Sequence, residues 1–134
     1  MGLIPCLQDE GRVESMSQPF QAGDNLVFQL ESAFGVVRVL AIDGEGPQTV
    51  WHLLVYEEFF PTVEDAERAI AAPDSLRIAK SHLALTDRAF ERTPTARIGH
   101  HELNEAELAA VRRWQESEVK EVLDRSVLQL LGMR

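Results

Sequence analysis

The stretch covering residues 21–43 constrains the fold of this chain more than any other, because it has the pattern of two strands joined by a tight turn. Gly, Asp and Asn at positions 23–25 provide turn chemistry where the first strand begins. Apolar side chains then alternate with their neighbours as far as Leu30, which is the period of a half-buried strand. Residues 35–43 are rich in β-branched side chains and almost continuously apolar, which is typical of a central strand. The stretch therefore predicts a β-hairpin at the centre of a sheet.

Two residues of this hairpin need a separate explanation. Gly35 is free to adopt a backbone conformation that a side chain would forbid, so we expect it to help reverse the chain within residues 32–35. Arg38 interrupts the valine-rich second strand. We expect it near a sheet end, exposed or paired with an acid such as Glu31, and a ligand-binding role is the alternative.

Further strands follow the hairpin. Residues 49–57 are rich in β-branched and aromatic side chains, residues 76–85 alternate again, and residues 96–99, with Phe90 before them, suggest one more short strand. Gly44 to Pro47 reads as a connecting loop. Together with the hairpin, these segments predict a sheet of four to six strands.

Two helical regions are also expected. Thr62 is a good N-cap with Asp65 three residues later, and an apolar stripe continues until Pro73, which predicts a short helix near residues 62–72. Asn104 with Glu107 has the same cap-and-acid spacing and predicts a helical region over residues 104–132. This region is long enough to break near residues 115–118, where polar residues interrupt its apolar side.

The expected fold class is therefore α+β: a curved, mainly antiparallel sheet or a small SH3-like barrel, with a short helix and a C-terminal helical region. A chain of 134 residues is one ordinary domain, with residues 1–19 as an irregular arm and residues 20–100 as the β-rich core. An edge strand at residues 12–16 is an open alternative within the arm.

Composition excludes several classes of protein. The single cysteine, Cys6, rules out an internal disulfide framework, and it has no neighbouring base to activate its thiol. We find neither a secretion signal nor an apolar run of the roughly 20 residues that cross a bilayer. A soluble, cytoplasmic protein without membrane contact is the expectation.

The charge is unevenly distributed along the chain. The formal net charge is −9; residues 1–60 hold nine acids and two bases, while residues 61–134 hold thirteen acids and eleven bases. An acidic balance argues against nucleic-acid binding, which needs clustered basic side chains, and it favours either simple solubility or attraction to a basic partner.

No motif in the chain marks a catalytic centre. His100, His101 and Glu102 resemble a metal-binding cluster, but neighbouring residues of an extended segment point in opposite directions, so we predict no metal site and no cofactor. His52 and His82 lie on expected strands, where they are core residues or, with Arg38, the lining of a pocket capable of acid–base chemistry. No serine or cysteine nucleophile has a recognisable motif around it.

The end of the third expected strand carries the clearest binding features. Glu57 and Glu58 are adjacent, so their carboxylates diverge and do not form a catalytic pair. Phe59 and Phe60 follow, and two consecutive residues of an extended segment cannot both face one core. Either the chain bends and buries both rings, or one ring is an exposed apolar anchor with an acidic rim, as binding hot spots often are.

Part of the chain resembles a known family. Gly23-Asp24 before an apolar strand, Gly35, the segment Val36 to Leu40, and a helix after Phe60-Pro61 are similar to bacterial immunity proteins. These are cytoplasmic antidotes of toxin systems, built on a small barrel-like sheet with helices. The resemblance covers about residues 20–100 and implies a toxin-binding inhibitor. Gly23-Asp24 is also similar to the start of the SH3-like barrel of toxin endoribonucleases, but the basic strand faces of such enzymes are missing.

The sequence therefore predicts a non-enzymatic protein-binding module. The specific form we expect is an immunity-type inhibitor whose acidic surface meets a basic partner. The residues expected at this surface are Glu31, Asp43, Glu45, Glu57, Glu58 and Phe59. One alternative is a small enzyme or ligand-binding barrel that uses Arg38, His52 and His82. A second alternative is a scaffold that forms a homodimer through its C-terminal helices.

Overall fold

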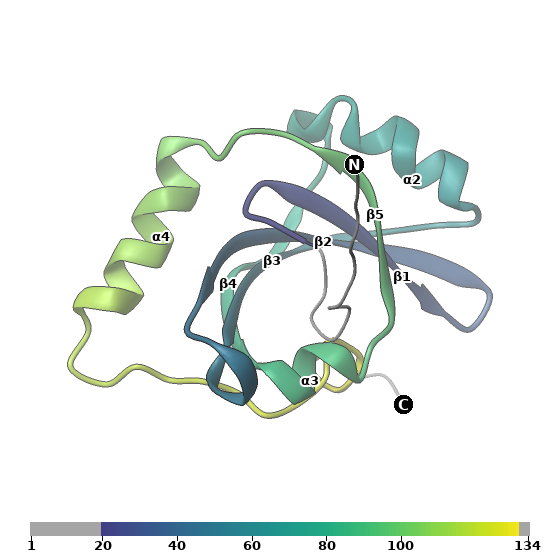
Figure 1. Cartoon of the computed structure of the whole chain (residues 1–134). Helices are drawn as coiled ribbons and strands as arrows, with labels where there is room; N and C mark the ends of the chain where they lie inside the picture. The colour runs from purple at the N-terminus through teal and green to yellow at the C-terminus, as the bar shows by residue number, and fades with distance from the viewer. Residues whose placement is uncertain (1–19, 132–134) are drawn as a thin grey trace, which may run out of the picture.

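The computed structural model describes residues 20–131, so the expected arm and the edge strand at residues 12–16 lie outside the described residues. Five strands form one antiparallel sheet in the order β4-β3-β2-β1-β5. Their bounds are β1 Asp24–Leu30, β2 Ala33–Asp43, β3 Val50–Phe60, β4 Ile78–Thr86 and β5 Thr95–His100. The sheet bends strongly (Figure 1), but its outer strands β4 and β5 do not pair with each other. The predicted α+β class is confirmed, in the form of an open curved sheet and not of a closed barrel.

The central hairpin forms as predicted, with two corrections at its turn. Leu30 pairs with Ala33, so the turn consists of Glu31 and Ser32 and not of residues 32–35. The residue with a positive φ is Glu31, at 47°. Gly35 instead provides space, because a Cβ atom there would lie 2.5 Å from the ring of Phe28.

Apolar side chains from the sheet form two cores, one on each face, because successive strand residues point to opposite sides. The first core contains Phe28, Val37, Leu53 and their neighbours and is covered by α3 (Asp87–Glu91) and α5 (Val127–Leu130). The second core contains Val36, Leu54 and Tyr56 and is covered by α2 (Val63–Ile70) and α4 (Glu105–Glu116). Figure 1 shows α2 and α4 outside the curve of the sheet and α3 across one end of it.

The helix starts agree with their sequence signals. Thr62 accepts a hydrogen bond from the Asp65 amide at the start of α2, and Asn104 forms a full capping box with Glu107 at the start of α4. The short helix α3 is an addition that the sequence did not predict. It begins after the cap Thr86 and contains Phe90, which was expected beside a strand and instead stacks on Trp51 at 4.0 Å between ring centroids.

The C-terminal region breaks where the polar residues predicted, because α4 ends at Glu116. The chain then runs along β4, where Leu123 bonds to the backbone of Ala84 and Thr86 and so covers that edge of the sheet. Asp124 accepts hydrogen bonds from Arg88 and Thr86, which hold the pKa of its carboxyl well below the usual range. Two 3-10 turns, Gly46–Gln48 and Pro73–Ser75, complete the fold, and no helix in residues 20–131 is long and apolar enough to cross a membrane.

Candidate functional site

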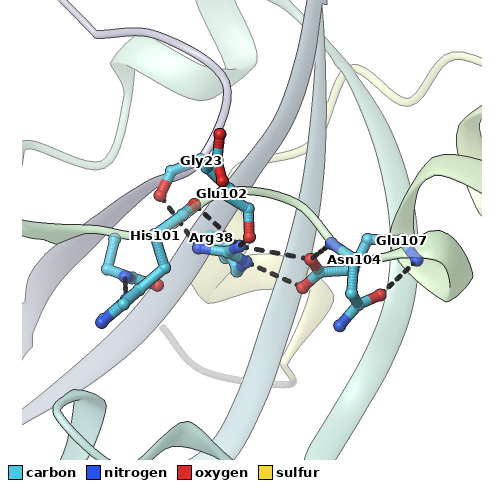
Figure 2. Close-up of polar contacts among 7 residues, drawn as sticks. Gly23, Arg38, His101, Glu102, Asn104 and Glu107 are labelled. Carbon is cyan, nitrogen blue, oxygen red and sulfur yellow. Dashed lines mark hydrogen bonds and ion pairs between the residues drawn. The ribbon is translucent and has the colours of Figure 1, made fainter.

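Arg38 lies at the centre of a buried polar cluster under α4. Its side chain is 4% exposed, and its Nε atom donates to Oε2 of Glu107 at 2.7 Å. The other guanidinium nitrogens donate to Oε1 of Glu107 and to the backbone carbonyls of Gly23, His101 and Glu102 (Figure 2). The expected pairing of Arg38 with an acid is confirmed, but the acid is Glu107 and not Glu31, and the expectation of an exposed arginine is wrong.

The position of Glu107 explains why this ion pair forms. Glu107 is the third residue of α4, and its Oε1 atom also accepts the backbone N–H of Asn104 to close the capping box (Figure 2). The same carboxylate therefore caps the helix and neutralises Arg38. Since its partner is held on the sheet, the start of α4 is fixed to β2 at this point.

A second polar cluster joins Asp43, His52 and His82. His52 is fully buried, and its Nε2 atom lies 2.8 Å from Oδ2 of Asp43. Its Nδ1 atom lies 2.8 Å from Nε2 of His82. Because an ionised Asp43 can only accept, His52 donates through Nε2, so its Nδ1 accepts the N–H of His82. This order leaves Nδ1 of His82 as the free end of the chain of hydrogen bonds.

The surroundings keep both imidazoles neutral. Burial lowers the pKa of His52, although Asp43 opposes this effect. Burial, His52 and Arg113 together lower the pKa of His82 to about 4. Trp114 of α4 closes the cluster with its ring 4.6 Å from that of His52, edge to face. A histidine with so low a pKa is a weak general base at neutral pH, so the arrangement is better suited to packing than to proton transfer.

The structure thus divides the residues of the expected pocket. His52 and His82 are in contact, while Arg38 belongs to the other cluster. The partners of the two clusters on α4 are Glu107 and Trp114, seven residues apart, which corresponds to roughly 10 Å along a helix. The three side chains share one face of the sheet and one covering helix, but they do not share a site.

A cleft of about 490 Å³ opens between α4 and strands β3 and β4. Arg38 and Tyr56 are part of its lining, whereas His52 and His82 are not. The lining is formed by Arg38, Leu54, Tyr56, Pro73, Asp74, Leu76, Ile78, Ser81, His101, Glu102, Asn104, Ala106, Glu107, Ala110 and Arg113. Its size falls within the range of small-molecule and side-chain pockets.

The residues expected at a partner-binding surface lie at opposite ends of β2. Glu31 precedes this strand, and Phe59 pairs with Gly35 near its start. Asp43 ends the strand, and Glu45 follows in the next loop. An 11-residue strand spans roughly 35 Å. The six residues therefore cannot form one compact contact surface, and the larger group is at the β1–β2 turn.

At the turn, Phe59 is 42% exposed, while Phe60 packs into the core beside α2 and α4. Glu57 is exposed two residues before Phe59, in a part of β3 where the pairing with β2 is irregular. The carboxylate of Glu58, between them, accepts the backbone N–H of Arg77. The reading in which the chain buries both rings is wrong, because the ring of Phe59 is exposed.

A groove of about 260 Å³ is lined by this ring and adjoins a larger groove of about 660 Å³. Both contain Gln29, Glu31 and Leu128, and the smaller one contains Phe59. We call Glu31, Glu57, Phe59 and Leu128, with the grooves between them, the turn-end surface. The larger groove is completed by Val27, Phe28, Phe34, Val63, Thr93, Pro94, Thr95 and Ala96, and the smaller by Leu30, Ser32 and Ala33.

His100 and His101 point to different partners. Nδ1 of His100 lies 2.8 Å from Oδ1 of Asp24, and Nδ1 of His101 lies 3.1 Å from Nδ2 of Asn25. Residues 20–131 contain no group of three metal-ligating side chains that could hold an ion.

Sequence reasoning missed Glu107, Trp114 and Tyr56 as members of these sites. The capping signal of Asn104 and Glu107 was visible, but nothing in it identified Arg38 as the second partner. Trp114 and Tyr56 had only the periodicity of core positions. The chain matches no family model, no curated protein and no solved structure.

Proposed function

We propose that this chain is a non-enzymatic protein-binding module and that its contact surface is the turn-end surface. The observation that carries this proposal is the 42% exposure of Phe59 beside two adjoining grooves. A large aromatic side chain costs free energy when it is left in water, and proteins expose such rings in apolar surroundings mainly where a partner covers them.

The shape and lining of the grooves support a protein as the occupant. They are shallow and continuous with each other, and most of their lining is apolar, including Phe34, Leu128 and Pro94. A central aromatic ring with apolar neighbours and a polar rim is the usual arrangement of an interaction hot spot. A small substrate would instead be enclosed on most sides.

The charges at this surface support a basic partner. Glu31 and Glu57 are exposed at its rim, and the chain carries a net charge of −9. Such a field steers a basic protein toward the surface and repels acidic ones. These properties agree with the resemblance to immunity proteins, and we propose an inhibitor that covers a basic active site of a toxin.

The alternatives have less support. An enzyme or ligand-binding site of Arg38, His52 and His82 needs an arginine whose N–H groups are available to a substrate or ligand. The guanidinium of Arg38 instead donates to Glu107 and to three backbone carbonyls. A homodimeric scaffold needs apolar helix faces for a second copy. On α4, Ala110 and Val111 pack on the helix's own sheet instead, and Leu108 is its one exposed large apolar residue, at 39%.

Comparative affinity capture tests the proposal. The tagged chain and the variant Glu57→Lys/Phe59→Ser serve as baits in a lysate of the source cells, and quantitative mass spectrometry compares the captured proteins. We expect the unaltered chain to retain a basic protein that the variant loses at least tenfold, since the variant removes both the aromatic anchor and an acid.

The matched control is Glu45→Lys, which makes one charge reversal in the exposed loop at the far end of β2. It should capture the same protein as the unaltered chain. If the control loses the protein as fully as the turn-end variant does, capture depends on the overall negative charge of the chain, and the proposed surface is wrong. If the captured protein is a toxin, equimolar addition of this chain should abolish its activity.

A further inference from the structure

We propose that the cleft between α4 and the sheet receives an arginine or lysine side chain of the partner protein. The inference rests on the proposed protein-binding function and extends it with a second contact point. Tyr56 of β3 and Ile78 of β4 pair with each other, and both line the cleft. A partner that covers the turn-end surface would insert one long basic side chain here.

The apolar walls of the cleft fit the alkyl part of such a side chain. Leu54, Leu76 and Ile78 form part of its lining, and 51% of the surface of Ile78 is exposed. Long basic side chains commonly lay their methylene groups on apolar surface while the charged head group reaches a polar one. Ile78 is among the most exposed large apolar residues in the described part of the chain, so covering it would be favourable.

A polar group without a partner lies inside the cleft. Tyr56 is only 6% exposed, yet its hydroxyl makes no hydrogen bond to any residue between 20 and 131, and its ring lines the cleft. The hydroxyl is not one of the fully buried polar atoms that lack a partner, so it is reached from the open space of the cleft and can meet a ligand there. Burial raises the pKa of Tyr56; Glu107 and Asp74 raise it further, whereas Arg38 lowers it.

The charges of the lining favour a cation. Glu107 and Arg38 neutralise each other, which leaves Asp74 and Glu102 against Arg113. Asp74 is near enough to raise the pKa of the Tyr56 phenol, whereas Arg113 lowers the pKa of His82, which is not part of the cleft lining. The end of the cleft at Tyr56 is therefore the negative end, where a guanidinium or ammonium group would meet Asp74 and the phenol oxygen.

The test uses Tyr56 as its own probe, because it is the only tyrosine of the chain. The ionisation of its phenol is followed by ultraviolet absorption with acetylated, amidated arginine, with the citrulline analogue, or with inorganic phosphate, all at equal ionic strength. We expect arginine to lower the pKa of Tyr56, since a bound cation stabilises the phenolate, and citrulline to leave it unchanged. A rise in this pKa with phosphate would show an anion site and overturn the inference.

A second measurement avoids alkaline pH, where an acidic chain can unfold. Amide resonances of Tyr56, Leu76 and Ile78 are followed at neutral pH while arginine or lysine amide is added. We expect saturable shifts with either amide, and a weakening of at least threefold in Asp74→Asn. The matched control Glu67→Gln changes an exposed acid on α2 outside the cleft and should leave the affinity unchanged.

The outcomes separate this inference from the proposed function. If the arginine and lysine amides cause no saturable shift while the turn-end variant still loses its partner, the cleft assignment fails and the protein-binding function stands. If a free diamine binds as tightly as the amino-acid amides and Asp74→Asn captures the partner unchanged, the cleft is not a contact for a partner side chain.

Discussion

Charged groups are buried and paired in the space under α4, whereas they are exposed at the turn-end surface. Under α4, Arg38 and Glu107 are buried and paired, and His52 has a partner on each ring nitrogen. At the turn end, Glu57 and Phe59 are exposed, and Glu31 has a positive φ that favours glycine. The first region uses polar groups to fix a helix on a sheet, whereas the second leaves charge and aromatic surface free for contact.

This difference separates two kinds of consequence. A buried polar group that loses its partner remains dehydrated, so substitutions under α4 should lower the stability of the fold. Exposed side chains at the turn end remain in contact with water in the folded chain, so they contribute little to the stability of the fold. Their substitution should change binding and leave the free energy of unfolding almost unaltered, except at Glu31, where the positive φ adds a backbone effect.

The largest effect is expected for Glu107→Ala. This change leaves the guanidinium of Arg38 buried without its counter-ion and removes the capping carboxylate of α4. We expect the free energy of unfolding in urea to fall by about 3–5 kcal/mol, the usual loss when one member of a buried ion pair is removed.

The double variant Arg38→Met/Glu107→Leu is the control for this interpretation. It removes both charges and keeps similar side-chain volumes, so it should recover a large part of the lost stability. If the double variant is as unstable as Glu107→Ala, the loss comes from packing at the start of α4 and not from the unpaired charge.

A smaller loss of stability, about 1–3 kcal/mol, is expected for Asp43→Ala, because it removes the acceptor of the buried N–H of His52. Urea unfolding measures it against Glu45→Ala, an exposed neighbour that should change stability by less than about 0.5 kcal/mol. Equal losses in the two variants would mean that the buried N–H of His52 is satisfied without Asp43. Asp43 would then be available for binding, as the sequence suggested.

The histidine cluster predicts a pH dependence. The pKa of His82 is about 4 in the folded chain against 6.5 for an ordinary histidine, with His52, Arg113 and Trp114 facing it. Between these values the unfolded chain binds more protons than the folded one, so stability rises with pH from about 4 to 6.5. The full shift corresponds to about 3 kcal/mol, and we expect about 1–2 kcal/mol because His82 is partly open to solvent.

The variant His82→Gln isolates this contribution. Acidic groups also make stability depend on pH, so the informative quantity is the difference between the two stability curves over this range. The variant should show the shallower rise. Parallel curves would mean that His82 titrates normally in the folded chain.

Residues with local signals could be predicted, and those with long-range partners could not. The apolar alternation of residues 26–30 and the caps at Thr62 and Asn104 follow from the nearest neighbours in sequence, and the structure confirms them. Glu107 lies 69 residues from Arg38, and the two partners of His52 lie 9 and 30 residues away on other elements, so no local pattern identifies them. The helix α3 was missed because five residues are too few to show a helical period.

The smallest effect, and the only gain, is expected at Glu31. A non-glycine residue in the left-handed region costs roughly 1 kcal/mol, so Glu31→Gly should raise the free energy of unfolding by about 0.5–1 kcal/mol. The adjacent change Ser32→Gly is the control: Ser32 has no positive φ, so glycine there should give no gain. Because Glu31→Gly also removes an acid from the turn-end surface, it should weaken capture of the partner while it stabilises the fold. A variant that is more stable and binds equally well would remove Glu31 from the contact surface, whereas loss of both properties would mean that its side chain supports the turn.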